Sequence, residues 1–335
     1  MNARIKPRID LPDRVRLKDE IPLRTPRVIY VDPCDRCNFQ CKFCPTGNRE
    51  ILRKVSGRGH GVMDFELYKK FVDGFCEFDD VVKVVRLYKD GEPLLNPRFP
   101  DMVAYAKKSG CCEKVDTTSN ASLLTRELGS RIVEAGLDRV NISVEGVNGA
   151  QYKEFSNISL DYEKFVDNIA YFYERRAQCE VFVKINGDIL DEEQTRDFYK
   201  TFGDISDGIF VEHAIDYWPR FEQKRVEINE EVGLLGDKSR EVLVCPYVFY
   251  EMAVNSDGTY SLCRFDWKRM QPLGGDLGAN VTPKRIWNSI HLWQLQCLFL
   301  RGERKSRWYC ANCGELRQGS PADLDEFREM LLDRF

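Results

Sequence analysis

The sequence lacks any stretch that would place the chain in a membrane or mark it for secretion. Its longest apolar runs fall far short of the roughly 20 residues that a membrane-spanning helix needs, and its mean hydropathy is −0.44. The first residues, MNARIKPRIDLPDRVRLKDE, are charged throughout and contain no apolar core segment of a signal peptide. We therefore expect a cytoplasmic protein, in a compartment that keeps thiols reduced or bound to metal.

An excess of charge of either sign is also missing. The 50 basic and 54 acidic residues leave a net charge of −4, which provides no bulk attraction to nucleic acid or to an anionic membrane. We expect neither as a partner. Basic side chains do gather in the N-terminal arm, at Arg4, Lys6 and Arg8, and again over 301–307. Because acidic residues interrupt both stretches, we expect them to be solvated faces.

Apolar, β-branched runs alternate with helical patterns from residue 27 to about residue 215. We expect strands over 27–32, 81–88, 113–119, 138–145, 180–186 and 207–213. We expect helices over 64–75, which Asp64 can cap, and over 98–109, 123–135, 161–177 and 191–202. Six such units predict an α/β fold, a partial (β/α)6 TIM-like barrel that stays open because it has fewer than eight units. Active sites in this architecture gather at the C-terminal ends of the strands.

The pattern changes in the C-terminal part of the chain. Residues 245–263 predict a hairpin, whose two alternating strands are joined by a turn over 256–258. Helical patterns follow over 283–300 and 321–335. We therefore expect three parts: an N-terminal arm over 1–26, the barrel over 27–238, and a small α+β domain over 239–335.

Cysteine is abundant, with 13 residues, and four of them lie in one loop directly after the first expected strand. Three of these, Cys37, Cys41 and Cys44, form a C-x3-C-x2-C pattern. Such a turn can bring three thiolates to three corners of a cubane iron–sulfur cluster and leave the fourth iron open, as a catalytic metal site requires. With Cys34 as a fourth ligand, the same loop could close a zinc site instead.

A second set of cysteines lies in the C-terminal segment, where Cys245 and Cys263 bracket the expected hairpin and Cys310 and Cys313 form a C-x2-C pair. Two separated pairs can hold zinc or a fully ligated iron–sulfur cluster, and spacing alone does not separate these metals. The remaining cysteines have a simpler interpretation. We expect small apolar residues at Cys76, Cys111, Cys112 and Cys179.

The segment CNFQCKFC after a first strand resembles the signature of radical S-adenosylmethionine (SAM) enzymes, and further segments match that family in order. DGEP, at the end of the second strand, resembles the segment that hydrogen-bonds the methionine amino group. TTSNASLL, after the third strand, resembles the family's Thr/Ser-Asn-Gly segment, with Ala121 where glycine is commoner. The resemblance implies SAM contacts at Phe43, beside the adenine, at Ser143 or Glu145, near the ribose hydroxyls, and at Gly91, Glu92, Pro93, Ser119 and Asn120.

The C-terminal segment CPYVFYEMAVNSDGTYSLC … RIWNS … YCANC resembles the twitch or SPASM extension of the same family, which holds auxiliary [4Fe–4S] clusters. Its four cysteines fit the shorter twitch form with one auxiliary cluster, and the arrangement is similar to that of the 2-deoxy-scyllo-inosamine dehydrogenase type of antibiotic biosynthesis. The resemblance therefore implies SAM and two [4Fe–4S] clusters as cofactors, and an electron donor such as flavodoxin or ferredoxin as a partner.

This resemblance implies an oxidoreductase that cleaves SAM to a 5′-deoxyadenosyl radical, removes hydrogen from a hydroxyl-bearing carbon of a sugar or aminocyclitol, and forms a ketone. The auxiliary cluster would accept the second electron. Three alternatives stay open: a redox-neutral epimerase or rearrangement enzyme, in which Cys297 could donate hydrogen, a ribosomal-peptide-modifying enzyme, and a non-catalytic zinc protein. For a peptide enzyme we expect a leader-binding module, for which the residues before the first strand are too few. No catalytic base is identified. We expect substrate contacts after strands five and six, at Lys184, Asn186, Asp188, Glu212 and Asp216.

Overall fold

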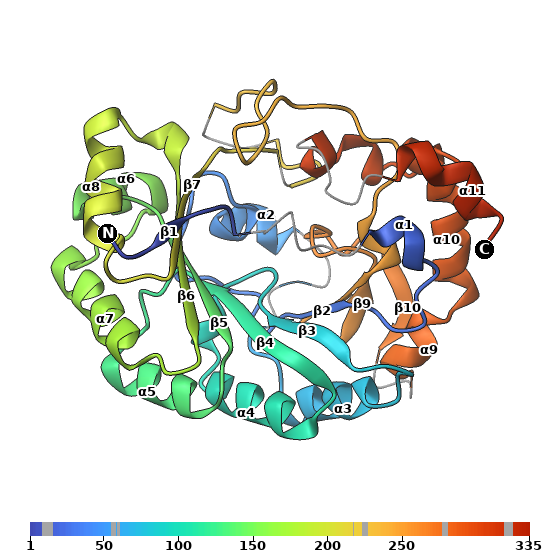
Figure 1. Cartoon of the computed structure of the whole chain (residues 1–335), viewed down its shortest axis with the longest axis horizontal. Helices are drawn as coiled ribbons and strands as arrows, with labels where there is room; N and C mark the ends of the chain where they lie inside the picture. The colour runs from blue at the N-terminus through green and yellow to red at the C-terminus, as the bar shows by residue number, and fades with distance from the viewer. Residues whose placement is uncertain are drawn as a thin grey trace.

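The computed structural model describes residues 1–8, 16–54, 58, 61–216, 218–222, 227–276, 281–317 and 324–335. Within these residues one ten-stranded sheet runs from the N-terminal arm to the C-terminal segment, in the order β1-β7-β6-β5-β4-β3-β2-β8-β9-β10. Figure 1 shows the two chain termini at opposite ends of this curved sheet. No helix among the described residues is both long enough and apolar enough to span a bilayer.

The six expected strands of the partial barrel are confirmed, and each pairs in parallel with the next along the chain. They are β2 (Val28–Val31), β3 (Val82–Leu87), β4 (Cys112–Ser119), β5 (Arg139–Val144), β6 (Glu180–Asn186) and β7 (Gly208–Glu212). Apolar side chains on these strands are buried, which explains why the β-branched runs predicted them.

The five expected crossover helices are also present and cover the outer face of the sheet (Figure 1). They are α3 (Phe65–Phe75), α4 (Phe99–Ser109), α5 (Arg126–Glu134), α7 (Tyr162–Arg175) and α8 (Glu192–Phe202). A side chain at the N-cap of four of them accepts a backbone N–H of the first turn, and α3, α7 and α8 start within one residue of the expected position. Helix α5 starts at Arg126, three residues after its expected start, because Thr125 is its N-cap. The capping residues are Asp64, Thr125, Asp161 and Asp191. The short helices α1 (Leu17–Glu20), α2 (Arg49–Arg53) and α6 (Gly149–Ser156) were not expected.

The C-terminal segment continues the barrel sheet. Strand β8 (Glu251–Val254) pairs in parallel with β2, and β9 (Thr259–Ser261) pairs antiparallel with β8, so the expected hairpin is confirmed. Strand β10 (Pro272–Asp276) follows antiparallel to β9. The helices beyond it are α9 (Pro283–Trp287), α10 (Ile290–Leu300) and α11 (Arg328–Leu332). Residues 321–323 of the last expected helix lie outside the described residues.

The N-terminal arm corrects one expectation. Strand β1 (Arg4–Ile5) pairs in parallel with β7, and the chain then turns inward, so that Arg8 is partly buried rather than solvated. Arg8 Nη1 donates to the Tyr88 hydroxyl at 2.9 Å, and Arg139 Nη2 donates to the Arg8 carbonyl at 3.3 Å. The arm therefore contributes a charged side chain to the inner side of the sheet.

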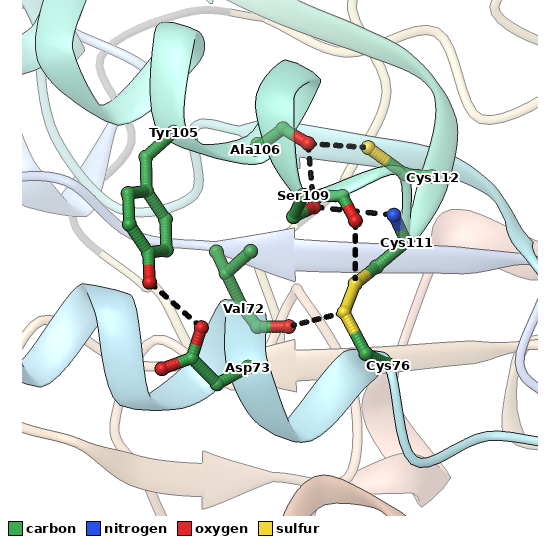
Figure 2. The surroundings of a disulfide bond; sticks show 8 residues. All are labelled: Val72, Asp73, Cys76, Tyr105, Ala106, Ser109, Cys111 and Cys112. Atoms are coloured by element: carbon green, nitrogen blue, oxygen red, sulfur yellow. Dashed lines mark hydrogen bonds between the residues drawn. A yellow bond between two sulfur atoms is a disulfide. The ribbon is translucent and has the colours of Figure 1, made fainter.

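Two cysteines also differ from expectation. Cys76, at the end of α3, and Cys111, just before β4, form a disulfide (Figure 2) instead of acting as separate apolar residues. The Ser109 hydroxyl accepts the Cys111 N–H at 3.1 Å and donates to the Ala106 carbonyl at 2.7 Å, which orders the connection between α4 and β4. Cys112 and Cys179 are buried free thiols, as expected.

Replacing Cys76 with serine should lower the free energy of unfolding by about 2–4 kcal/mol, because a crosslink restricts the unfolded chain. The bond joins residues 35 positions apart. Urea unfolding without reductant measures the difference between wild type and Cys76→Ser, and reductant should bring wild type down to the variant. Cys179→Ser is the matched control, because it removes a cysteine outside the disulfide. The free energy of unfolding of this variant should still fall when reductant is added. A wild type that is insensitive to reductant would contradict the bond.

Candidate functional site

The cysteine loop begins directly after β2, and Cys37, Cys41 and Cys44 are free thiols within it. The Phe39 N–H donates to Cys37 Sγ at 3.4 Å, and the Ser156 hydroxyl lies 3.4 Å from Cys41 Sγ. Burial, followed by the nearby Glu92 carboxylate, raises the pKa of Cys37 to about 12. Burial raises the pKa of Cys41 and Cys44 as well. These thiols stay neutral unless a bound metal replaces their protons.

The segment after β3 packs against this loop through its backbone. The Glu92 N–H donates to the Arg36 carbonyl at 2.8 Å. A Cβ at Gly91 would collide with the carbonyl oxygens of Arg36 and Cys34. Because both oxygens belong to the backbone, a side chain here would displace the cysteine loop, so the position requires glycine.

The Glu92 carboxylate connects this segment to the end of β4. Its Oε1 accepts from the Ser119 hydroxyl at 2.7 Å and from the Leu94 N–H at 3.0 Å, and its Oε2 accepts from the Asn120 N–H at 2.8 Å. Burial raises the pKa of Glu92, while the three donors act in the opposite direction. The Asn120 amide in turn lies 3.8 Å from Cys37 Sγ. Glu92, Ser119 and Asn120 therefore form one hydrogen-bonded group beside the cysteine loop, and Pro93 is buried next to it.

Ala121 has a φ of +55°, in the left-handed region. A residue with a Cβ costs roughly 1–2 kcal/mol in this conformation. Glycine avoids that cost, which is a physical reason for glycine to be commoner at this position of the motif.

A cavity of about 670 Å³, partly open to solvent, lies at the C-terminal ends of β5, β6 and β7. Three of the expected SAM contacts line it: Phe43, Ser143 and Glu145. Four of the expected substrate contacts line it too: Lys184, Asn186, Glu212 and Asp216. Asp188 instead accepts the Ala214 N–H at 2.6 Å and lies 2.8 Å from Nδ1 of His213, which also lines the cavity.

The carboxyl of Glu145 is the most strongly perturbed acid at this cavity. Burial raises the pKa of Glu145 to about 7, although the Lys184 ammonium acts in the opposite direction. Lys184 also pairs with Glu212 across β6 and β7. The cavity thus offers donors, acceptors and charges of both signs to a polar ligand.

A second cavity, partly open to solvent, lies among residues of the C-terminal segment and Pro219, and its lining is almost wholly apolar. All four expected ligands of the auxiliary cluster line it and are free thiols: Cys245, Cys263, Cys310 and Cys313. Burial raises the pKa of Cys310 to about 11 and that of Cys313 to about 12. The structure thus brings together cysteines from distant parts of the sequence, since Cys245 and Cys313 are 68 residues apart.

Arg304 is a functional candidate that the sequence did not predict. It is buried, contrary to the expected solvated face over 301–307, and donates to the carbonyls of Val242, Leu243 and Cys310. Its charge lowers the pKa of Cys245, Cys310 and Cys313 against the larger effect of burial. An arginine in a basic stretch carries no mark of burial in the sequence, because its partners are backbone carbonyls distant along the chain.

Comparison with known families identifies the chain. The family model described as the radical SAM superfamily matches residues 31–205, which is just over half of the sequence. The chain belongs to the radical SAM superfamily. Membership implies SAM and a [4Fe–4S] cluster as cofactors, in agreement with the expectation from the first cysteine loop.

Among curated relatives, GTP 3′,8-cyclase of Staphylococcus haemolyticus is 24% identical over 188 residues, covering 53% of this chain and 51% of that protein. The tungsten-containing aldehyde ferredoxin oxidoreductase cofactor-modifying protein of Pyrococcus furiosus is 32% identical over 125 residues, covering 37% of this chain and 32% of that protein. The chain therefore spans about half or less of the length of these relatives.

Several solved structures share the fold over most of their length. BtrN in complex with AdoMet and 2-DOIA has a TM-score of 0.58 at 16% identity, covering 89% of this chain and 97% of that one. SuiB of Streptococcus suis, bound to S-adenosylmethionine, has a TM-score of 0.59 at 13% identity, covering 90% and 73%. anSMEcpe with bound AdoMet has a TM-score of 0.57 at 14% identity, covering 92% and 96%.

The two cysteine sets fit iron–sulfur clusters in the chemistry of their donors. Three thiols in the first loop and four around the apolar cavity are the ligand sets of a cluster with one open iron and of a fully ligated cluster. Among the described residues, no three His, Cys, Asp or Glu side chains converge on a point that would suit one metal ion. A cubane does not require that convergence, since each cysteine binds a different iron.

Gly91→Ala should displace the first cysteine loop and leave the auxiliary site intact. We expect the iron content of anaerobically reconstituted protein to fall by about four irons per chain, with SAM cleavage lost. Gly110→Ala is a control for glycine replacement away from the site, because a Cβ there would meet no atom within 4 Å, although its φ of +70° carries a backbone cost. Full iron content and SAM cleavage in Gly91→Ala would contradict the packing argument.

Cys34→Ser should keep the cluster, whereas Cys37→Ser, Cys41→Ser and Cys44→Ser should each lose it. Cys34 Sγ donates to the Arg36 carbonyl at 3.6 Å, a contact that a serine hydroxyl can also make. Iron content and 5′-deoxyadenosine formation distinguish the two groups of variants. Loss of iron in Cys34→Ser would make Cys34 a ligand and refute the proposed division of the loop.

Proposed function

We propose that this radical SAM enzyme oxidises a secondary alcohol of a sugar or aminocyclitol to a ketone, with a second [4Fe–4S] cluster as electron acceptor. The observation that carries this proposal is the apolar cavity that Cys245, Cys263, Cys310 and Cys313 line together. Four cysteines can provide one ligand to each of the four irons of a cluster. A cluster held in this way has no open iron to bind substrate, and it is suited to electron transfer.

When bound, SAM and the two clusters supply hydrogen-atom abstraction at a substrate carbon and acceptance of the second electron that ketone formation releases. The chain's own residues bind and orient these cofactors and shield them from water. Cys37, Cys41 and Cys44 hold the first cluster. Gly91, Glu92, Pro93, Ser119 and Asn120 hold the methionine end of SAM, Ser143 and Glu145 its ribose, and Phe43 its adenine.

The cavity at the ends of β5 to β7 is the proposed substrate site. Lys184 and Asn186 from β6, Glu212 from β7 and Asp216 beyond it provide donors and acceptors around one space. Hydroxyl and amino groups on neighbouring carbons suit such a lining, because each needs a hydrogen-bond partner when it leaves water. The fold shared with BtrN, which was solved in complex with AdoMet and 2-DOIA, supports a small-molecule substrate.

The position of Cys297 bears on the epimerase alternative. Cys297 is buried on α10 and is not part of the lining of either cavity. A hydrogen donor must reach the substrate carbon, so this position supports dehydrogenation over epimerisation by Cys297. The peptide alternative is supported by the fold shared with SuiB bound to its precursor peptide SuiA, at a TM-score of 0.59 and 14% identity.

The proposal predicts about one 5′-deoxyadenosine for each ketone formed when reduced enzyme is incubated with SAM and an aminocyclitol or sugar. Cys310→Ser should still cleave SAM but form little ketone, because the acceptor site has lost a ligand. Cys297→Ser is the matched control and should keep both products. The measurements are liquid chromatography of 5′-deoxyadenosine and mass spectrometry of the substrate.

A product of unchanged oxidation state that gains deuterium from solvent would replace the proposal with the epimerase. Modification of a peptide with no ketone from any polyol would replace it with the peptide enzyme. Zinc without iron in anaerobic protein would end the radical interpretation of both cysteine sets.

A further inference from the structure

The segments that follow β6 and β7 bring an acid and an imidazole together at the first cavity. The register of these strands pairs Asn186 with Glu212, so the residues after them leave the sheet side by side. Asp188 comes two residues after Asn186, and His213 directly follows Glu212. A Cβ added at Gly187 would collide with a side chain of β7, so glycine allows the turn to lie close to that strand.

Asp188 holds the imidazole ring of His213 in one orientation. One oxygen of its carboxylate lies 2.8 Å from His213 Nδ1, and the other accepts the Ala214 N–H at 2.6 Å. The Asp188 backbone N–H in turn donates to the Asn186 side chain at 3.0 Å. A carboxylate accepts hydrogen bonds and does not donate them, so Nδ1 carries the hydrogen of the neutral ring. The lone pair of neutral His213 is therefore on Nε2.

The Nε2 atom of His213 is left for a ligand, because it has no hydrogen-bond partner among the described residues. His213 lines the first cavity. Its side chain is 41% exposed, so a molecule in the cavity and solvent water can both reach the ring. The backbone at this position is fixed as well, since the His213 N–H donates to the Leu234 carbonyl at 2.9 Å.

The other titratable side chains of the cavity are less suited to accept a proton from substrate. Lys184 pairs with Glu212, and an ammonium group has no lone pair to accept a proton. Glu145 and Asp216 are the remaining acids of the lining, and Glu145 is already proposed to bind the ribose. His213 combines a place in the lining with a carboxylate that orients its second nitrogen, which is the arrangement of an oriented general base.

We propose that His213 Nε2 accepts the proton of the substrate hydroxyl that is oxidised, while Asp188 orients the ring through Nδ1. This proposal rests on the proposed function. His213 is the catalytic residue, and Asp188 is a positioning residue that acts through it. When Nε2 takes the proton, the ring becomes an imidazolium cation, and the Asp188 carboxylate at 2.8 Å from Nδ1 stabilises that charge.

The step balances with the reactants already named. Oxidation of a CH–OH group to a ketone removes two hydrogens and two electrons. The carbon–hydrogen bond breaks first, and its hydrogen leaves as an atom to the adenosyl radical. The O–H bond then breaks and its proton passes to Nε2, while the remaining electron passes to the auxiliary iron–sulfur cluster and the carbon–oxygen bond becomes double. The exposed ring later returns its proton to solvent.

The order of these steps provides the test, with substrate deuterated at the carbon that is oxidised and reduced holoenzyme supplied with SAM. In His213→Gln, ketone formation should fall by about 10²–10⁴-fold, the usual effect of losing a general base. Deuterium should still pass from substrate to 5′-deoxyadenosine, because that transfer precedes the loss of the proton. A variant that only misplaced the substrate would lose both. His291→Gln, exposed on α10, is the matched control and should change neither.

Asp188→Asn should reduce ketone formation nearly as far, because an amide can donate to Nδ1 and so place the ring hydrogen on Nε2. Asp188→Glu should restore ketone formation in part, because it keeps the acceptor. The ¹⁵N chemical shifts of the histidine ring, assigned by their loss in His213→Gln, report the tautomer at about pH 8, where an ordinary imidazole is neutral. We expect the hydrogen on Nδ1 in wild type and on Nε2 in Asp188→Asn.

Unchanged ketone formation in His213→Gln, or a wild-type ring with its hydrogen on Nε2, would overturn the role of His213 and leave the proposed function standing. If Glu145→Gln or Asp216→Asn instead loses the ketone and keeps deuterium transfer, that acid is the base and His213 is not. Wild-type enzyme that forms no ketone from any polyol would overturn the proposed function and the role of His213 together.

Discussion

The buried carboxylate of Glu92 is the contact on which the first site depends. It receives the Leu94 N–H from its own segment and the Ser119 hydroxyl and Asn120 N–H from the end of β4. Its backbone N–H holds the Arg36 carbonyl in the cysteine loop. Three successive strand ends are therefore tied at one buried acid, whose desolvation is offset only while all its donors remain in place. Losing one donor would loosen the cysteine loop as well.

A second buried group of charges joins this loop to the C-terminal segment. Arg58 donates to the Asp35 carbonyl, the Thr46 hydroxyl and the Trp267 carbonyl. Arg269 pairs with Asp35 at 3.3 Å and lies 3.9 Å from Asp90. Pairs of this kind contribute little net stability, because desolvation cancels much of the attraction. They do fix geometry, since breaking one leaves a charge buried without its partner. The separation between the two cysteine sets is thus held by directional contacts as well as by the shared sheet.

Most of the barrel was predictable because its signals are local. β-branched runs predicted the six strands, and helical patterns predicted the five crossover helices, the first of them with Asp64 as its cap. The spacing of the first cysteines predicted a metal-binding loop, and the resemblance to radical SAM enzymes favoured an iron–sulfur cluster over zinc. The pairing of β8 with β2 was not predictable, since no local pattern states which strand a hairpin joins. The burial of Arg8 and Arg304 was not predictable for the same reason. Both residues lie in basic stretches, and the oxygen atoms that they contact belong to residues distant along the chain. The Cys76–Cys111 disulfide depends on α3 and β4 meeting, which helix and strand patterns alone do not specify.

Contacts between residues far apart in the sequence also connect the C-terminal segment to the inner side of the barrel sheet. Arg264 follows Cys263 and pairs with Glu251 at 2.5 Å and with Glu315 at 3.2 Å. Its guanidinium lies 5.3 Å from the ring of Tyr30, which is packed against Tyr88. A row of charged and aromatic side chains therefore runs from Arg264, which follows Cys263, to Tyr88 at the end of β3. The N-terminal arm contributes Arg8, which donates to Tyr88, and the C-terminal segment contributes Arg264 and the four thiols, so residues from both ends of the chain contribute to the inner side of the barrel sheet.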